Sequence, residues 1–149
     1  SCTLVIVGRL SDLHKSLLSI NNIDYENYEG ISNEVLLNEY ILCDFLIFAS
    51  LYEGFGLPII EAQSVGRPVL TSNIWSMPEV AGEGALLVDP YCIESIREGV
   101  RTIINNEGYR NKNIEAGFKN IKRFSSKFIA MEYAKVYREV HNDITLEKI

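Results

Sequence analysis

Two carboxylates, Glu53 and Glu61, flank a short turn that contains Gly54 and Gly56. Glycines allow a tight turn and a close approach of a ligand to the backbone. A turn that leads into a helix also leaves backbone N–H groups without helical partners, and such groups can bind a phosphate. Carboxylates accept hydrogen bonds from sugar hydroxyls. A site with both properties would suit a ligand that carries phosphate and hydroxyl groups together, such as a nucleotide sugar.

The segments on both sides of this turn predict how it is held. Apolar residues 45–49 predict a strand just upstream. Downstream, a helix is expected from Leu57 to about Val65, because Pro58 suits the first helical turn and Gly66 suits the position after a helix end. Ligands bind an open α/β sheet at the carboxyl ends of its strands, which is where this turn would lie.

Strands and helices alternate along most of the chain. Residues 3–7 predict a buried parallel strand, and Ser11 predicts the N-cap of the helix that follows it. Further strands are expected at 25–31, 68–71 and 85–88, with a helix starting at Ser32 and helices filling the chain from Cys92 onward. This alternation predicts an α/β fold, a Rossmann-like doubly wound parallel sheet with C-terminal helices.

The composition describes one ordinary globular domain. The chain has 149 residues, of which 47% are apolar, and a net charge of −6. We expect a domain over residues 1–141 and a frayed tail over 142–149. The negative charge argues against nucleic-acid binding. No apolar run approaches a membrane span and no signal sequence is evident, so a cytoplasmic protein is expected.

The cysteines and histidines give no sign of a metal site or a disulfide framework. Cys2, Cys43 and Cys92 are far apart in the sequence, with no pair of cysteines at metal-ligand spacing. The expectation is reduced, structural thiols, no metal and no cofactor.

One segment has the opposite charge from the rest. Residues 110–127 contain a single acid, Glu115, and six basic residues: Arg110, Lys112, Lys119, Lys122, Arg123 and Lys127. Such a segment could contact anionic lipids at the inner face of a membrane. A solvated helix face explains it equally simply, and we favour that interpretation.

Several motifs together resemble a known family. Residues 53–61 resemble the E-x7-E signature of the family 4, or group 1, nucleotide-sugar glycosyltransferases. The resemblance continues in order through residues 66–70, 78–80 and 84–90, and covers nearly the whole chain. It implies the C-terminal, donor-binding half of a GT-B fold, in a retaining and metal-independent enzyme. Polysaccharide or glycolipid synthesis is a reasonable expectation for such a family.

The resemblance also implies roles for individual residues. Glu61 would hold the ribose hydroxyls of the nucleotide. Glu53 would contact hydroxyls of the donor sugar and stabilise positive charge at the reacting carbon. Gly54 and the N–H groups of Phe55, Gly56 and Leu57 would contact sugar or phosphate oxygens. The nucleobase pocket would lie at the end of the second strand, at Gly30 and Ile31.

The same resemblance implies that part of the enzyme is elsewhere. Residues 3–7 match the second strand of the donor domain, so its first strand and a phosphate-binding Arg/Lys pair are expected upstream of Ser1. The partners expected are a nucleotide-sugar donor and an N-terminal acceptor domain of the same protein. The chain alone would then be inactive.

Other interpretations of the function stay open, and so do the roles of Trp75 and Met77. The chain could be a non-catalytic nucleotide-sugar-binding module, or belong to a GT-B epimerase or a phosphorylase-like enzyme. Trp75 and Met77 lie after the strand at 68–71 and could approach the sugar, but packing in a core or a domain interface is favoured. The donor sugar, the nucleobase and the acceptor are not determined by the sequence.

Overall fold

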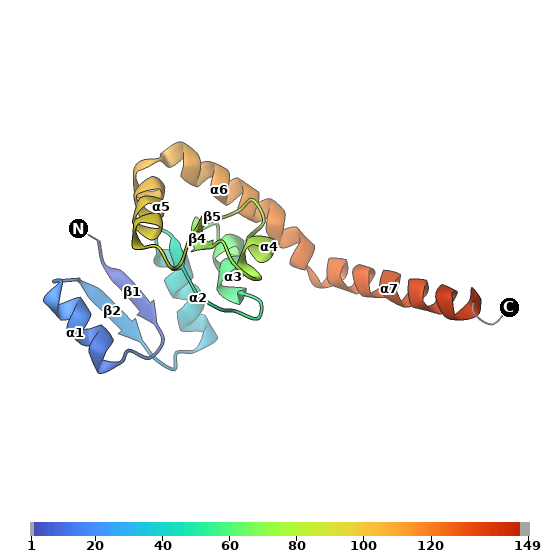
Figure 1. Cartoon of the computed structure of the whole chain (residues 1–149), viewed down its shortest axis with the longest axis horizontal. Helices are drawn as coiled ribbons and strands as arrows, with labels where there is room; N and C mark the ends of the chain where they lie inside the picture. Colours follow the sequence, from blue (N-terminus) through green and yellow to red (C-terminus); the bar gives the residue numbers. More distant parts are fainter. Residues whose placement is uncertain (1, 147–149) are drawn as a thin grey trace. The chain divides into compact units, whose positions relative to one another are not determined.

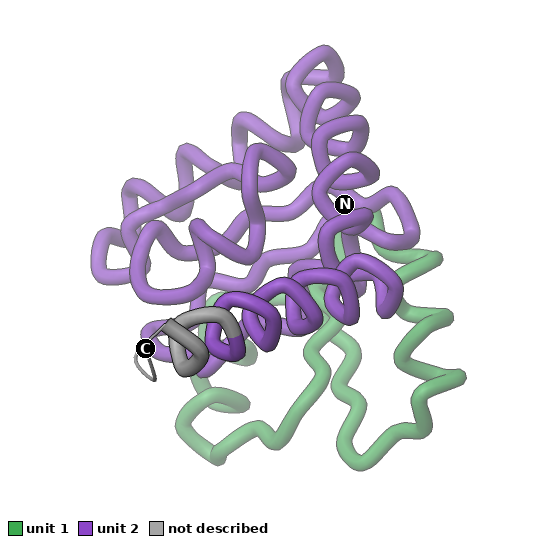
Figure 2. Tube along the Cα trace, turned by 90° about the vertical axis from the view of Figure 1, so that its right-hand side faces the viewer, with its two compact units in different colours: residues 1–44 green, residues 45–149 purple. Residues whose placement is uncertain are grey.

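The computed structural model describes residues 2–146, and the side chains of residues 2–141. It divides into two compact units, residues 1–44 and residues 45–149 (Figure 2). Each unit has its own parallel sheet, so each is described by itself.

Unit 1 consists of two strands and two helices in alternation. Its elements are β1 (Leu4–Val7), α1 (Asp12–Ile20), β2 (Tyr25–Tyr28) and α2 (Asn33–Leu42). The strands run parallel, with Leu4 opposite Tyr25. Both helices begin at the serines predicted as starts: the Ser11 hydroxyl accepts a hydrogen bond from the His14 N–H at 3.2 Å, and the Ser32 hydroxyl accepts one from the Val35 N–H at 3.3 Å.

The prediction that the first strand is buried is wrong. Leu4, Val5 and Val7 are 38%, 37% and 49% exposed. Within the described residues β1 pairs with β2 alone, so its sheet has only two strands and few neighbouring side chains to cover it. The second strand is also shorter than predicted, because the chain leaves the extended conformation before Gly30, whose φ is +66°.

Unit 2 contains the remaining strands, all parallel, in the order β3–β4–β5. These strands are β3 (Leu46–Phe48), β4 (Val69–Ser72) and β5 (Leu86–Val88). Its helices are α3 (Leu57–Ser64), α4 (Met77–Ala81), α5 (Ile93–Asn105), α6 (Glu107–Asn120), the 3-10 turn η1 (Ile121–Phe124) and α7 (Ser126–Leu146). Parallel strands that alternate with helices confirm the predicted α/β class (Figure 1).

The core of unit 2 lies where helix α5 meets the sheet. Leu70, Val88 and Ile103 are 0–2% exposed and pack together, with partly buried apolar side chains around them. Gly99 allows α5 to approach this closely, because a Cβ atom there would lie 2.7 Å from Leu70 Cδ1 and 2.8 Å from Val88 Cγ1. A glycine in mid-helix is therefore a packing residue here.

The last helix reaches into the predicted tail. Helix α7 continues to Leu146, and the rest of the segment predicted as a tail lies outside the described residues. None of the described helices combines the length and the apolar content needed to cross a membrane.

Candidate functional site

The glycine-containing turn lies at the carboxyl edge of the unit 2 sheet, between β3 and α3. Gly56 is the N-cap of α3 and has φ +105°, a conformation that other residues rarely adopt. A Cβ atom at this position would also approach Ile59 Cδ1 to 3.1 Å. Gly54 differs, since its φ is not positive and nothing lies within 4 Å of the place its Cβ would occupy. Only Gly56 is required by the turn itself.

Glu53 is half-buried and is braced by serines. The Ser50 hydroxyl donates to Glu53 Oε1 at 2.9 Å, and the Ser76 hydroxyl donates to the Glu53 carbonyl oxygen at 3.1 Å. The Ser72 hydroxyl donates to the Ser50 carbonyl oxygen at 2.6 Å. Ser72 ends β4, so the loop after β4 supports the loop after β3. These serines were not predicted as site residues, although their place at the ends of strands is a signal that the sequence contains.

The backbone of the turn offers N–H groups for an anion. Among the described residues, no protein acceptor takes a hydrogen bond from the N–H of Phe55, Gly56 or Leu57. Leu57 is the first residue of α3, so these groups surround a helix N-terminus. The Phe55 ring contacts the Phe124 ring edge-on, with centroids 5.7 Å apart, and ties the turn to η1.

Helix α3 ends as its sequence predicts. Gly66 follows the helix with φ +72° and its N–H donates to the Gln63 carbonyl, while the Arg67 N–H donates to the Ala62 carbonyl at 2.9 Å. This pair of bonds is a Schellman motif. Glu61 is half-buried in the second turn of the same helix. The turn thus leads directly into the helix that contains Glu61, and both ends of this helix are defined.

A buried amide network, which was not predicted from the sequence, holds α3 in place. Gln63 is 1% exposed, and its Nε2 donates to the carbonyl oxygens of Ala81 and Gly84, both at 3.0 Å. Asn120 Nδ2 donates to Gln63 Oε1 and to the Val80 carbonyl oxygen, both at 2.8 Å. Gln63 stands two positions after Glu61, so the network links the helix of the turn to α4 and α6.

The predicted nucleobase residues belong to unit 1. Gly30 is exposed and Ile31 is half-buried, in the link between β2 and α2. Nearby, the Tyr28 hydroxyl donates to Glu26 at 2.9 Å, and this hydrogen bond and the negative charge of Glu26 raise the pKa of Tyr28. The assignment of Gly30 and Ile31 to a base pocket stays a prediction.

Trp75 and Met77 have opposite environments, although they are two positions apart. Met77 is 0% exposed and starts α4, which confirms the packing role predicted for it. Trp75 is 67% exposed in the loop after β4 and contacts Tyr52 edge-on. Trp75 therefore does not pack in the core, and the other predicted role, packing in a domain interface, stays a prediction.

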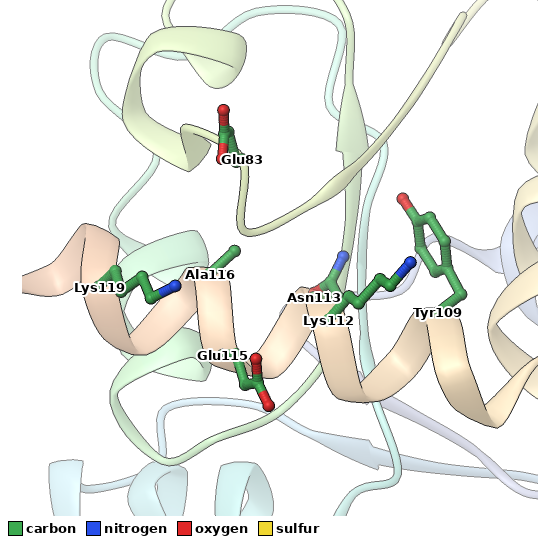
Figure 3. Close-up of a pocket in the computed structure, with 7 residues that line it drawn as sticks. All are labelled: Glu83, Tyr109, Lys112, Asn113, Glu115, Ala116 and Lys119. Atoms are coloured by element: carbon green, nitrogen blue, oxygen red, sulfur yellow. The ribbon is translucent and has the colours of Figure 1, made fainter.

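A hollow elsewhere on unit 2 is formed mainly by α6 (Figure 3). Its walls mix acidic and basic side chains, and none of the predicted site residues contributes to them. The lining residues are Glu83, Tyr109, Lys112, Asn113, Glu115, Ala116 and Lys119. The buried member, Asn113, uses its Oδ1 to accept from the Val69 N–H at 3.0 Å. Its amide therefore serves the fold, and the hollow is not the candidate site.

The fold and the turn define a Rossmann-like α/β protein in which a glycine turn leads into a helix N-terminus at the carboxyl edge of the sheet. Residues 1–120 match the family described as "Glycosyl transferases group 1". The chain belongs to this family, which confirms the resemblance found in the sequence.

Individual relatives agree with this membership. The chain is 32% identical over 108 residues to the O-antigen chain mannosyltransferase B of Escherichia coli, which covers 72% of this chain and 28% of that protein. The C-terminal domain of LpcC, a glycosyl transferase group 1 protein of Francisella tularensis, has a TM-score of 0.67 and 23% identity, over 80% of this chain and 68% of that one.

A third similarity is to a protein solved with ligands. Anabaena HepE, in complex with UDP and glucose, has a TM-score of 0.78 and 18% identity, over 92% of this chain and 40% of that one. At these identities the solved structures show a shared fold. The chain spans well under half of the mannosyltransferase and of HepE.

Proposed function

We propose that this chain is the donor-binding domain of a retaining glycosyltransferase. The whole protein would transfer a sugar from a nucleotide diphosphate sugar to an acceptor during polysaccharide or glycolipid synthesis. Family membership supports the reaction class, and the O-antigen mannosyltransferase supports the synthetic role. The HepE complex with UDP and glucose supports the type of donor.

The observation that carries this proposal is the braced turn at residues 53–57. Glu53 is held by Ser50 and Ser76, and the neighbouring N–H groups have no protein acceptor among the described residues. A fixed carboxylate and fixed N–H groups need little reorganisation when a charged ligand arrives, and so can stabilise charge that develops during the reaction.

The proposed chemistry follows from the placement of these groups. Glu53 accepts hydrogen bonds from sugar hydroxyls and stabilises positive charge as the bond from the anomeric carbon to phosphate breaks. The N–H groups of residues 55–57 and the N-terminal end of α3 stabilise the negative charge on the departing phosphate. Glu61 accepts hydrogen bonds from the ribose. The donor is a substrate, and the mechanism uses no metal and no cofactor.

The partners and location follow from the same proposal. A separate acceptor domain of the same protein would complete the site, so the chain by itself is expected to be inactive. Product formed by the chain alone from any donor and acceptor would contradict this expectation. The protein is proposed to work in the cytoplasm.

A peripheral membrane contact through residues 110–127 has less support. Arg110 donates to the carbonyl oxygens of Ile103 and Ile104, both at 2.7 Å, and Arg123 donates to the Glu79 carbonyl oxygen. These two guanidinium groups stabilise helix ends within the protein. Only the exposed lysines of this segment are then left to contact a lipid surface. A solvated face is therefore still the interpretation we favour.

Calorimetric titration tests the donor site directly. The ligands are UDP, GDP and ADP, each alone and as its glucose or mannose conjugate. We expect weak binding of one nucleotide class, and a loss of affinity of about tenfold in Glu61→Gln, because a neutral amide oxygen replaces the charged acceptor of the ribose hydrogen bonds. Glu115→Gln on α6 is the matched control, and its affinity should equal that of the unchanged chain.

The full-length protein provides the decisive repeat of this titration. If neither the chain nor the full-length protein binds any nucleotide or conjugate, the donor-site proposal fails and a non-catalytic module with a degenerate site becomes the better interpretation. A full-length protein that interconverts nucleotide sugars, without transferring the sugar to an acceptor, would instead indicate the epimerase alternative.

A further inference from the structure

The loop after β4 presents an exposed aromatic side chain that has no role in the donor site proposed above. Trp75 is the one tryptophan of the chain and is 67% exposed. It contacts Tyr52, which is 72% exposed and belongs to the loop after β3. The ring centroids are 5.7 Å apart and the ring planes meet at 73°. Two large rings thus stand in solvent at the same edge of the sheet.

The backbone of Trp75 is held in an uncommon conformation. Its φ of +56° lies in the left-handed region, which a bulky non-glycine residue adopts only when its surroundings enforce it. Here the Ser72 hydroxyl bonds the Ser50 carbonyl oxygen at 2.6 Å, and the Asn73 N–H bonds the Val88 carbonyl oxygen at 2.8 Å. These two hydrogen bonds fix the backbone of the loop, and the fixed backbone keeps the Trp75 ring exposed.

The same bonds place the two rings next to Glu53. Tyr52 precedes Glu53 in the chain, and Ser76, which follows Trp75, donates its hydroxyl to the Glu53 carbonyl oxygen at 3.1 Å. Glu53 itself is half-buried and braced by Ser50. An aromatic surface therefore adjoins a fixed carboxylate, and both belong to the edge where ligands bind such a sheet.

This pairing matches the chemistry of a sugar ring. A pyranose has hydroxyls around its rim, and these can donate hydrogen bonds to a carboxylate. It also has a face of C–H groups, which packs well on an aromatic ring. We propose that Trp75, oriented by Tyr52, stacks on the pyranose ring of the donor beside Glu53 and selects among sugars. This inference rests on the proposed donor site.

The single tryptophan allows a direct test on the unchanged chain. An isotope-labelled sample gives one indole N–H signal in a two-dimensional NMR spectrum. The probes are UDP-glucose, GDP-mannose and ADP-glucose, each compared with its nucleoside diphosphate. We expect the indole signal to shift with the nucleotide sugar that binds, and to stay in place with the matching diphosphate.

Variants distinguish a sugar contact from a structural role. Trp75→Ala should weaken binding of the nucleotide sugar by about fivefold, within the range of one aromatic contact, and leave the diphosphate affinity unchanged. Trp75→Phe keeps a ring and should retain most of the affinity. A loss of affinity for both ligands in Trp75→Ala would indicate a structural role and overturn the inference.

The test also separates this inference from the donor site itself. If other backbone signals report binding of a nucleotide sugar while the indole signal stays in place, the stacking role is overturned and the donor site stands. An indole signal that shifts equally with the diphosphate overturns it too. If no nucleotide or nucleotide sugar binds the chain or the full-length protein, the donor site fails and the stacking role fails with it.

Discussion

The two units are built from the same kinds of element but differ in burial. Unit 2 contains all the fully buried side chains that the structure describes, and unit 1 contains none. Both have parallel strands and capped helices, so local sequence signals are equally good in each. The difference teaches that capping and strand pairing define elements, while buried apolar area supplies most of the stability. The candidate carboxylates lie in the unit with the core.

The largest expected effect on stability comes from shortening a side chain in the core of unit 2. Leu70 is 0% exposed in the cluster that joins β4 to α5. Leu70→Ala should lower the free energy of unfolding by about 2–5 kcal/mol, because it removes apolar contacts and leaves a cavity. Urea unfolding followed by circular dichroism measures the change.

The matching substitution in unit 1 is its control. Leu17 is 51% exposed on α1, so Leu17→Ala should change the free energy of unfolding by less than about 1 kcal/mol. Equal losses for the two leucines would mean that unit 1 buries more apolar surface than its exposure indicates, and the contrast between the units would not hold.

An intermediate effect is expected from the buried amide network of unit 2. Gln63→Leu removes the side-chain donor to the carbonyl groups of Ala81 and Gly84, and one of the two acceptors of Asn120 Nδ2. We expect a loss of about 1–3 kcal/mol in the free energy of unfolding. Ser64→Ala, at the exposed neighbouring position, should change it by less than about 0.5 kcal/mol. Similar results for the two variants would show that the network contributes nothing.

The smallest effects should come from removing helix caps. The unit in which amide protection falls then tests whether the two units open separately. Ser32→Ala removes the cap of α2 in unit 1, and Asn106→Ala removes the cap of α6 in unit 2. Each should cost about 1 kcal/mol, or about fivefold in amide protection. Hydrogen exchange should show the Ser32 effect confined to unit 1, because a unit without a core opens at lower cost.

The Asn106 variant completes this comparison. Its effect should spread to the amides of β3, β4 and β5, because α6 belongs to the unit that opens as a whole. A fall in protection at β4 caused equally by Ser32→Ala would mean that the two units open together.

Local signals predicted the elements well because their physics is local. Ser11 and Ser32 cap helices, and Gly66 ends one, since each effect depends on a few neighbouring backbone groups. The run from Glu53 to Glu61 likewise forms the predicted turn and helix. These parts of the fold and of the candidate site could be predicted from the sequence.

What the sequence did not predict depends on distant partners. Residues 4–7 look like a buried strand, but burial depends on what covers them. Gln63 looks like an ordinary helix residue, and only the loops after α4 and the end of α6 make it a buried hub. The serines around Glu53 come from two loops that the chain connects through a helix and a strand. Such contacts need the tertiary structure.

The loop that carries Trp75 has a consequence for how such enzymes could diversify. Its ends are anchored by Ser72 and Met77, both 0% exposed, while residues 73–76 between them are partly or fully open to solvent. Ser76 is the N-cap residue of α4 and its hydroxyl bonds the Glu53 carbonyl oxygen, but substitutions at residues 74 and 75 would leave the hydrogen bonds of the loop in place. Under the proposed stacking role of Trp75, exchange of these two residues beside an unchanged carboxylate would be a simple route by which related proteins acquire a new sugar preference without rebuilding their fold.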